Sequence, residues 1–237
     1  MLMDLIRAIA ARDGSAVRQL EANPGLARMA VEIGAGRHSP KDFFLEQIQH
    51  HVYRGDTALH LAAAAHDREL SAGLLAAGAD VHASNRRGAR PLHYAMNGRP
   101  DAKEWDPAAQ AAVVQCLIDA GAQPDALDKS GVGALHRGVR TRCAAAVRTL
   151  LANGADVHLK NGSGSTPLHL AVQDTGRSGS GSEASRSQQR EIILELLRHG
   201  ARATDKDKAG NSVLQSAKGD WIVDLLAASG DRGTHPP

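Results

Sequence analysis

The 237-residue chain has very few aromatic residues, with two Trp, two Tyr and two Phe making up 3% of the sequence. Large rings normally supply much of the buried area in a single globular core of this length. Here Ala, Leu and Val must fill the interior, which suits thin layers of closely packed helices better than one thick core. The composition therefore favours a layered helical protein.

The sequence also has few cysteines, no long apolar run and a small net charge. Cys116 and Cys143 are the two cysteines, and we expect free buried thiols rather than a disulfide. No stretch approaches the roughly 18 uninterrupted apolar residues of a membrane-spanning helix, and Asp4 and Arg7 interrupt the apolar run that a secretory signal needs. The formal charge is +2, too small to indicate nucleic-acid or membrane binding. The sequence predicts a cytoplasmic protein that binds neither.

What the sequence does contain is a repeated tetrapeptide that ends in Leu-His. The four copies are Thr57-Ala58-Leu59-His60, Arg90-Pro91-Leu92-His93, Gly133-Ala134-Leu135-His136 and Thr166-Pro167-Leu168-His169. An apolar pair of the Leu-Leu type and then Gly-Ala follow each copy. The leucines are separated by 33 (59 to 92), 43 (92 to 135) and 33 (135 to 168) residues. A period of this length is typical of a solenoid whose units pack on their neighbours.

A regular unit runs from Asp128 to Lys160. A tight turn precedes Gly131, where glycine supplies permissive backbone angles. A short inner helix starts at Ala134, an outer helix follows with apolar residues at helical spacing, and Gly154 ends that helix. This unit predicts an all-α solenoid of helix-turn-helix repeats joined by short β-hairpin-like turns.

We expect a single domain over residues 1–230, with about six repeats including degenerate end caps, and a disordered tail over 231–237. The expected repeats are 4–30, 54–85, 86–127, 128–160, 161–206 and 207–229, with an insert at 31–53. Two repeats carry extra residues between the inner and outer helix, around 98–107 and 175–187. The second is rich in Gly and Ser and is expected to be a loop, whereas the first contains Trp105.

The insert is the part of the chain that the repeat pattern does not explain. Its apolar residues Phe44, Leu45 and Ile48 predict a short helix over about 40–52 with one face turned inward. On such a helix Asp42, Glu46 and His50 would share the opposite face, and Glu46 and His50 would have the spacing of a metal-binding pair. A solvated amphipathic face explains the same pattern, and we favour that interpretation.

These motifs resemble the ankyrin repeat family over nearly the whole chain, from about Leu5 to Ala228. The insert, the Trp105 segment and the Gly/Ser-rich segment resemble bacterial ankyrin-repeat proteins to which no activity is assigned. The resemblance implies that His60, His93, His136 and His169 bridge neighbouring turns by hydrogen bonds. It also implies recognition of another protein by hairpin tips and inner helices, without identifying that protein.

The expected partner-binding residues lie on the predicted concave surface. They are Arg86, Arg87, Tyr94, Lys129, Arg137, Arg140, Gln173 and Trp105. Tyr94 and Arg137 stand where the usual motif has Leu, so each is either packed between repeats or partly exposed. Arg is favoured at interface hot spots because it forms planar, bidentate hydrogen bonds.

The leading functional hypothesis is a monomeric, non-catalytic scaffold that binds another protein and needs no metal or cofactor. One alternative is a bacterial effector that acts on host proteins. A less favoured alternative is a metal-dependent hydrolase built on Asp42, Glu46 and His50. The sequence contains neither a G-x-S-x-G elbow nor a Walker A motif.

Overall fold

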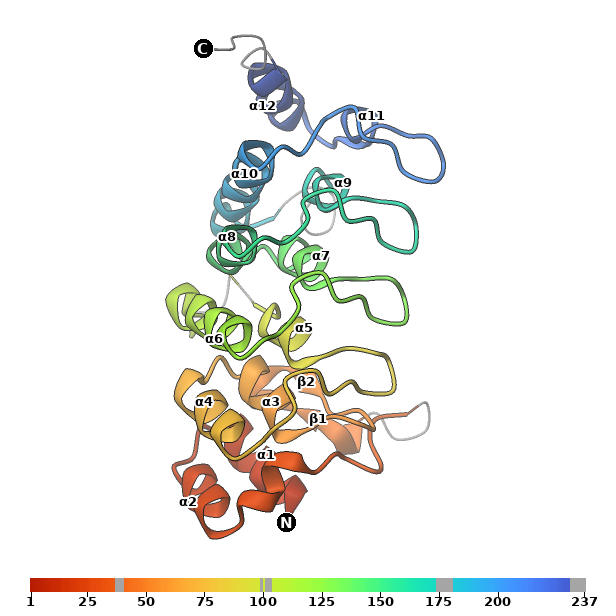
Figure 1. Cartoon of the computed structure of the whole chain (residues 1–237). Coiled ribbons are helices and arrows are strands. Elements are labelled where there is room, and N and C mark those ends of the chain that lie inside the picture. The colour runs from red at the N-terminus through yellow and green to blue at the C-terminus, as the bar shows by residue number, and fades with distance from the viewer. Residues whose placement is uncertain (37–40, 99, 101–103, 174–180, 231–237) are drawn as a thin grey trace.

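The computed structural model describes residues 1–36, 41–98, 100, 104–173 and 181–230. Within these residues the helices form six pairs stacked along one direction (Figure 1). The inner helices are α1 (Leu2–Ala10), α3 (Ala58–Ala64), α5 (Pro91–Ala95), α7 (Ala134–Arg140), α9 (Pro167–Ala171) and α11 (Val213–Ser216). The outer helices are α2 (Ser15–Ala22), α4 (Arg68–Ala76), α6 (Pro107–Asp119), α8 (Ala144–Ala152), α10 (Glu183–Arg198) and α12 (Asp220–Gly230). The predicted all-α solenoid is confirmed.

Three columns run the length of the molecule, namely the outer helices, the inner helices and the hairpin-like turns, here called fingers (Figure 1). Each finger precedes an inner helix, and two of them contain antiparallel bridges, Leu127–Gly133 and Lys206–Ser212. Adjacent fingers stack closely. A Cβ on Gly131 would lie 2.8 Å from the backbone N of Gly162, and the φ of Gly131 is +71°, so only glycine fits there.

The core consists of thin layers between successive helix pairs. The four tetrapeptide leucines, at positions 59, 92, 135 and 168, are all buried, as are the alanines at 58, 62, 63 and 134. Pro91 and Pro167 occupy the first helical position, where the missing N–H costs no intrahelical hydrogen bond. Small side chains let neighbouring helices approach closely, which explains how a chain with so few aromatics fills its interior.

The two extended repeats differ from their neighbours in the outer helix. α6 has 13 residues and α10 has 16, against 9 in α4 and α8. The prediction of a loop over 175–187 is wrong from Glu183 onward, because those residues form the first turns of α10, capped by Ser182. Residues 174–180 and the predicted tail, 231–237, lie outside the described part of the chain.

A buried glutamine holds each extended outer helix to its inner helix. Gln110 donates to the Ala95 carbonyl at 2.9 Å, and Gln189 donates to the Ala171 carbonyl at 2.7 Å. Both glutamines lie 11 residues before the helix-ending glycine, Gly121 or Gly200, which is the position of the N-cap in the regular repeats. The glutamine therefore bonds the carbonyl end of the inner helix where a tight turn is missing.

The helix predicted over 40–52 is not formed by the residues described there. Instead β1 (Phe44–Leu45) and β2 (His50–His51) pair antiparallel, flanked by the 3-10 turns η2 (Lys41–Phe43) and η3 (Glu46–Ile48). Gln49 takes a left-handed conformation, φ 50°, which closes the hairpin. A short apolar run does not distinguish helix from strand by its period. Here the packing of Leu45 and Val52, both buried, favours the hairpin.

Removal of the C-terminal cap is expected to cause aggregation. In a chain ending at Gly219, the loss of α12 uncovers the apolar face against which Ile222 and Leu226 are buried, and exposed apolar faces of that kind promote association. Light scattering and size-exclusion chromatography measure the effect. A chain ending at Gly230 is the control and is expected to aggregate no more than the full chain. Equal behaviour of the two truncations would contradict the prediction.

Candidate functional site: the concave surface and the insert

The tetrapeptide histidines form a ladder along the stack. In each, Nδ1 accepts a backbone N–H three residues earlier, from residues 57, 90, 133 and 166, at 3.1–3.2 Å. Nε2 therefore carries the proton and donates to a carbonyl of the next finger: Ala89, Val132, Ser165 and Asn211 in turn, at 3.0–3.3 Å. These bonds confirm the bridging role implied for His60, His93, His136 and His169.

Burial keeps several histidines neutral. Desolvation lowers the pKa of His60 and of His93 to about 4. It lowers the pKa of His50 and of His66 to about 4 as well. The neutral form is the one that the ladder requires, because Nδ1 of a protonated ring could no longer accept a hydrogen bond.

A buried polar network, which the sequence patterns did not reveal, joins Asp56 and Asn85 to α5. The carboxylate of Asp56, fully buried, accepts hydrogen bonds from the Tyr94 hydroxyl at 2.8 Å and the Asn85 amide at 2.8 Å, and from the Tyr53 backbone N–H at 2.7 Å. Burial raises the pKa of Asp56 to about 6. The one feature of the sequence that could have indicated this network is Tyr94, which stands where the usual motif has Leu after the tetrapeptide.

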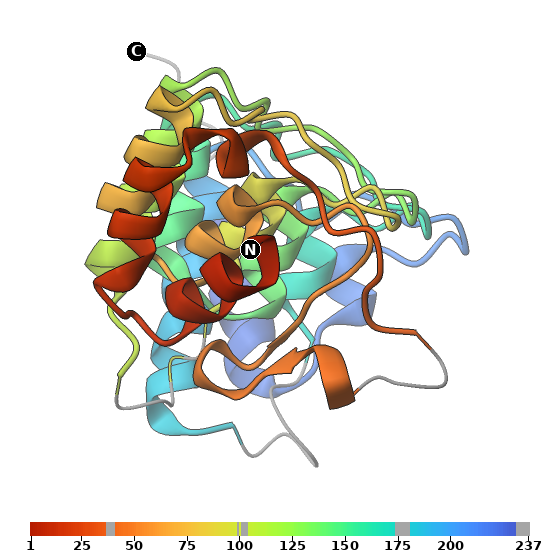
Figure 2. The same cartoon turned by 90° about the horizontal axis from the view of Figure 1, so that it is seen from below.

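Tyr94 was predicted to contact a partner, and this is wrong. Its side chain is 1% exposed, and its ring packs against His50 and His60 with centroid distances of 4.3 and 5.0 Å. His50 belongs to the insert, and its Nδ1 bonds the amide of Asn97 at 3.1 Å. The insert thus lies against the inner helices (Figure 2) and buries the residue that was expected to be accessible.

Arg86 and Arg87, also predicted to bind a partner, hold the insert in place. Arg86 Nη2 donates to the Ala35 carbonyl, and Arg87 Nη1 donates to the Tyr53 hydroxyl at 3.0 Å. Both guanidinium groups lie over the Tyr53 ring, at 5.4 and 5.0 Å from its centroid. Both residues remain exposed at the surface, but reversing their charge would release intramolecular contacts.

Three other predicted site residues also have intrachain partners. Arg137 forms an ion pair with Asp128 at 2.8 Å, and Lys129 Nζ donates to the Arg86 carbonyl at 3.0 Å. Gln173 donates to the His169 and Ser216 carbonyls. Lys129 is exposed, whereas Arg137 and Gln173 are half-buried. These contacts fix the positions of the side chains and leave the Lys129 ammonium accessible.

Arg140 is exposed at the end of α7, and no hydrogen bond or ion pair joins it to another described residue. The fingers add further exposed cations, Lys160, Lys206 and Lys208. Carboxylates near them are engaged by the chain itself: Asp207 accepts the Ala209 and Asn211 backbone N–H groups. The described later repeats therefore carry several exposed cations, with the Asp207 carboxylate held by backbone N–H groups among them.

Trp105 is half-buried and donates from Nε1 to Gln110 at 2.9 Å. It forms one wall of an open cavity of about 580 Å³, and the insert turn Gln47–His50 forms another. The floor comes from the ends of α1 and α3, at Ala10, Ala11, Ala64 and Ala65. The two departures from the repeat pattern thus meet at one place.

The metal-site hypothesis fails on geometry. Asp42 lies in η2, Glu46 in η3 and His50 in β2, so no helical face brings the three side chains together. Across the ranges given above for the structure, no group of three His, Cys, Asp or Glu side chains is placed to hold a metal ion. The arrangement therefore gives no support to the hydrolase alternative.

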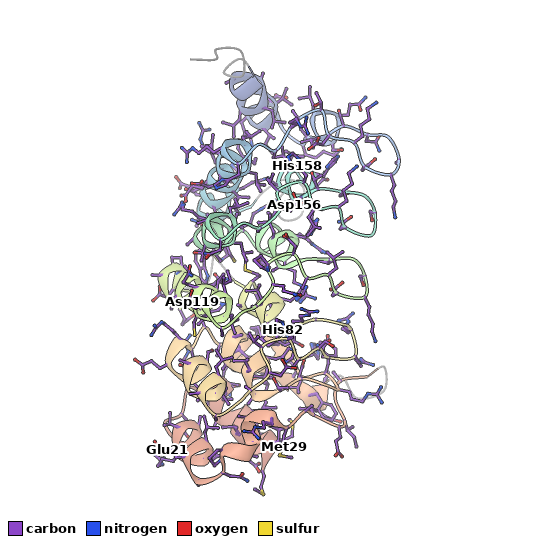
Figure 3. All side chains as sticks on the ribbon, viewed as in Figure 1. Glu21, Met29, His82, Asp119, Asp156 and His158 are labelled. Atoms are coloured by element: carbon purple, nitrogen blue, oxygen red, sulfur yellow. The ribbon has the colours of Figure 1, made fainter. Side chains whose placement is uncertain are left out.

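His82 and His158 occupy equivalent places between an outer helix and a finger (Figure 3). The backbone N–H of each donates to an aspartate two residues earlier, Asp80 or Asp156, at 2.8 Å. The His158 ring also contacts Asp205 at 3.2 Å. The two backbone bonds are local, whereas the contact with Asp205 joins adjacent repeats. Among the described helices, none is long and apolar enough to cross a membrane.

Comparison with known proteins agrees with the repeat pattern. A profile described as "Ankyrin repeats (many copies)" matches residues 117–171, and one described as "Ankyrin repeat" matches residues 54–86. The chain is 29% identical over 171 residues to the mouse B-cell lymphoma 3 protein homolog, covering 72% of this chain and 34% of that protein.

Two further relatives align over about half of the chain. Identity to the human neurogenic locus notch homolog protein 1 is 33% over 141 residues, which cover 49% of this chain and 6% of that protein. Identity to the mouse ankyrin repeat and SOCS box protein 16 is 32% over 120 residues, which cover 49% of this chain and 25% of that protein. The chain thus spans about a third or less of the length of these relatives.

Proposed function

Because the chain belongs to the ankyrin repeat family, we propose that it is a non-catalytic scaffold that binds another protein on its concave surface. Repeats of this family generally mediate protein–protein interaction. The observation that carries the proposal is the histidine ladder, which fixes each finger to the preceding inner helix and makes the concave surface rigid. A rigid surface loses little conformational entropy on binding.

The partner that fits best has an acidic surface. Arg140, Lys160 and Lys208 are exposed on the later repeats, whereas the nearby carboxylate of Asp128 is paired with Arg137 and with backbone N–H groups. Complementary charge steers association and disfavours wrong partners. In the first three repeats the insert covers part of the inner-helix surface, so the exposed area for a large partner lies over α7, α9 and α11.

Charge reversal at Arg140 and Lys160 together tests this proposal. We expect the double variant Arg140→Glu/Lys160→Glu to lose a specific partner in affinity purification from the source cell. Its melting temperature is expected to stay close to that of the wild type, because both side chains are exposed and the substitutions remove only the exposed hydrogen bond from Lys160 to the Lys206 carbonyl. Arg190→Glu, an exposed arginine on the outer helix α10, is the matched control. Equal retention by both variants would reject the proposed surface.

A bacterial effector that acts on host proteins is a narrower version of the same binding function. No structural observation favours it, and the relatives compared above are animal proteins. Detection of the protein in the cytosol of a host cell is the measurement that would support it.

A further inference from the structure

The cavity between the insert and Trp105 has the size and lining of a ligand site. Its volume of about 580 Å³ falls within the roughly 300–1,000 Å³ of pockets that take small ligands. Alanine side chains at the ends of α1 and α3 line it together with Ile48 and Trp105, and Gln47, Gln49 and Asn97 contribute amide groups. The small alanine side chains leave room for a large apolar group.

The walls offer unused amide groups. Gln47 is exposed and has no hydrogen bond to another described residue. Gln49 donates through Nε2 to the Glu46 carbonyl, and Asn97 donates through Nδ2 to His50, so the amide oxygens of both remain available. Primary amides offer both donors and acceptors, as a peptide main chain does.

Among the described residues that line the cavity, charge is balanced rather than concentrated. Arg12 donates to the Ala65 carbonyl at 2.9 Å, and Glu104 brings a carboxylate to the same rim. A phosphate or a strongly acidic group would be favoured by clustered cations, and the cavity lacks such a cluster among its described lining residues.

We infer that this cavity binds a large apolar side chain of an extended peptide segment, whose main-chain amides bond Gln47, Gln49 and Asn97. The inference rests on the proposed function, since the segment belongs to the protein partner. It adds an anchor pocket to the basic surface of the later repeats. Aromatic and large aliphatic anchors in small pockets supply much of the affinity of such interfaces.

Selection of phage-displayed random dodecapeptides on the full chain tests the inference. We expect enriched peptides to share one Leu, Met, Phe or Trp, and replacement of that residue by Ala in the synthetic peptide to weaken binding by about tenfold or more. Titration calorimetry measures the affinity. In a Trp221→Phe background, Trp105 is the single tryptophan, and its fluorescence is expected to change on binding.

Two Ala→Phe variants distinguish peptide binding in the cavity from binding elsewhere on the surface. Ala11→Phe places a ring in the cavity from an exposed position, and we expect it to weaken peptide binding by about tenfold. Ala76→Phe, exposed on α4, is expected to change it less than about twofold. Peptides that bind Ala11→Phe as tightly as the wild type, or failure to enrich any peptide, would overturn the inference. Loss of such peptides on Arg140→Glu/Lys160→Glu alone would overturn the cavity site and support the proposed basic surface.

Discussion

Lowering the pH from 7 to 5 is expected to reduce the free energy of unfolding by several kcal/mol. Burial lowers the folded-state pKa of His50, His60, His66 and His93 to about 4, whereas an unfolded histidine titrates near 6.5. Between these values the unfolded chain binds protons that the folded chain does not. The free energy of unfolding that these four histidines contribute is therefore fully present above about pH 6.5 and is lost as the pH falls toward 4.

Asp56 acts in the opposite direction. Burial raises its folded-state pKa to about 6, so between about 4 and 6 the folded chain binds one proton more than the unfolded chain. Four histidines less one aspartate leave about three protons, each worth about 1.4 kcal/mol per pH unit near pH 5. These five groups thus contribute a slope of about 4 kcal/mol per pH unit, which is a large fraction of the roughly 5–15 kcal/mol of total stability typical of a protein.

Urea unfolding followed by circular dichroism at a series of pH values measures this slope. His93→Gln is expected to lower the slope by about 1.4 kcal/mol per pH unit, the contribution of one proton. His66→Asn provides the same test at a residue outside the ladder. His82→Gln is the control, because the His82 ring is exposed in the folded state. A midpoint of unfolding that stays constant between pH 7 and pH 5 would contradict the prediction.

Tyr94→Ala is expected to lower the free energy of unfolding by about 4 kcal/mol, as large-to-small changes of aromatic core residues do. The ring is fully buried between His50 and His60, and its hydroxyl bonds the buried Asp56 carboxylate. The substitution both opens a cavity and removes one hydrogen bond from a desolvated carboxylate. Guanidinium unfolding monitored at equilibrium gives the change.

The two tyrosines of the chain provide a matched comparison. Tyr94→Phe removes only the hydroxyl bonded to Asp56 and is expected to cost about 1–3 kcal/mol. Tyr53 is half-buried, and its hydroxyl forms an exposed hydrogen bond with Arg87, so Tyr53→Phe is expected to cost less than about 1 kcal/mol. If both substitutions had the same effect, the buried network would not carry the stability assigned to it.

These expectations depend on residues whose roles the sequence revealed to different degrees. The bridging role of His60 was implied by the resemblance of the tetrapeptide to the ankyrin motif, and it holds because every repeat uses the same local geometry. The accessible role predicted for Tyr94 was wrong, because a chain segment more than 40 residues earlier covers it. Asp56 and Asn85 gave no signal, since a buried polar pair and an exposed one have the same sequence pattern.

The sequence by itself determined the repeat architecture. A period near 33 with Leu, His and Gly at fixed places specifies helix pairs that pack only on their neighbours, so local patterning is sufficient to define the stack. Only the tertiary structure decided the conformation of the insert, the burial of Tyr94, and the meeting of the insert turn with Trp105 at one cavity. The insert has no repeat to define its register, and a short apolar run fits either a strand or a helix. Its structure is set by nonlocal contacts with α5 and with Arg86 and Arg87, which periodicity along the chain does not encode.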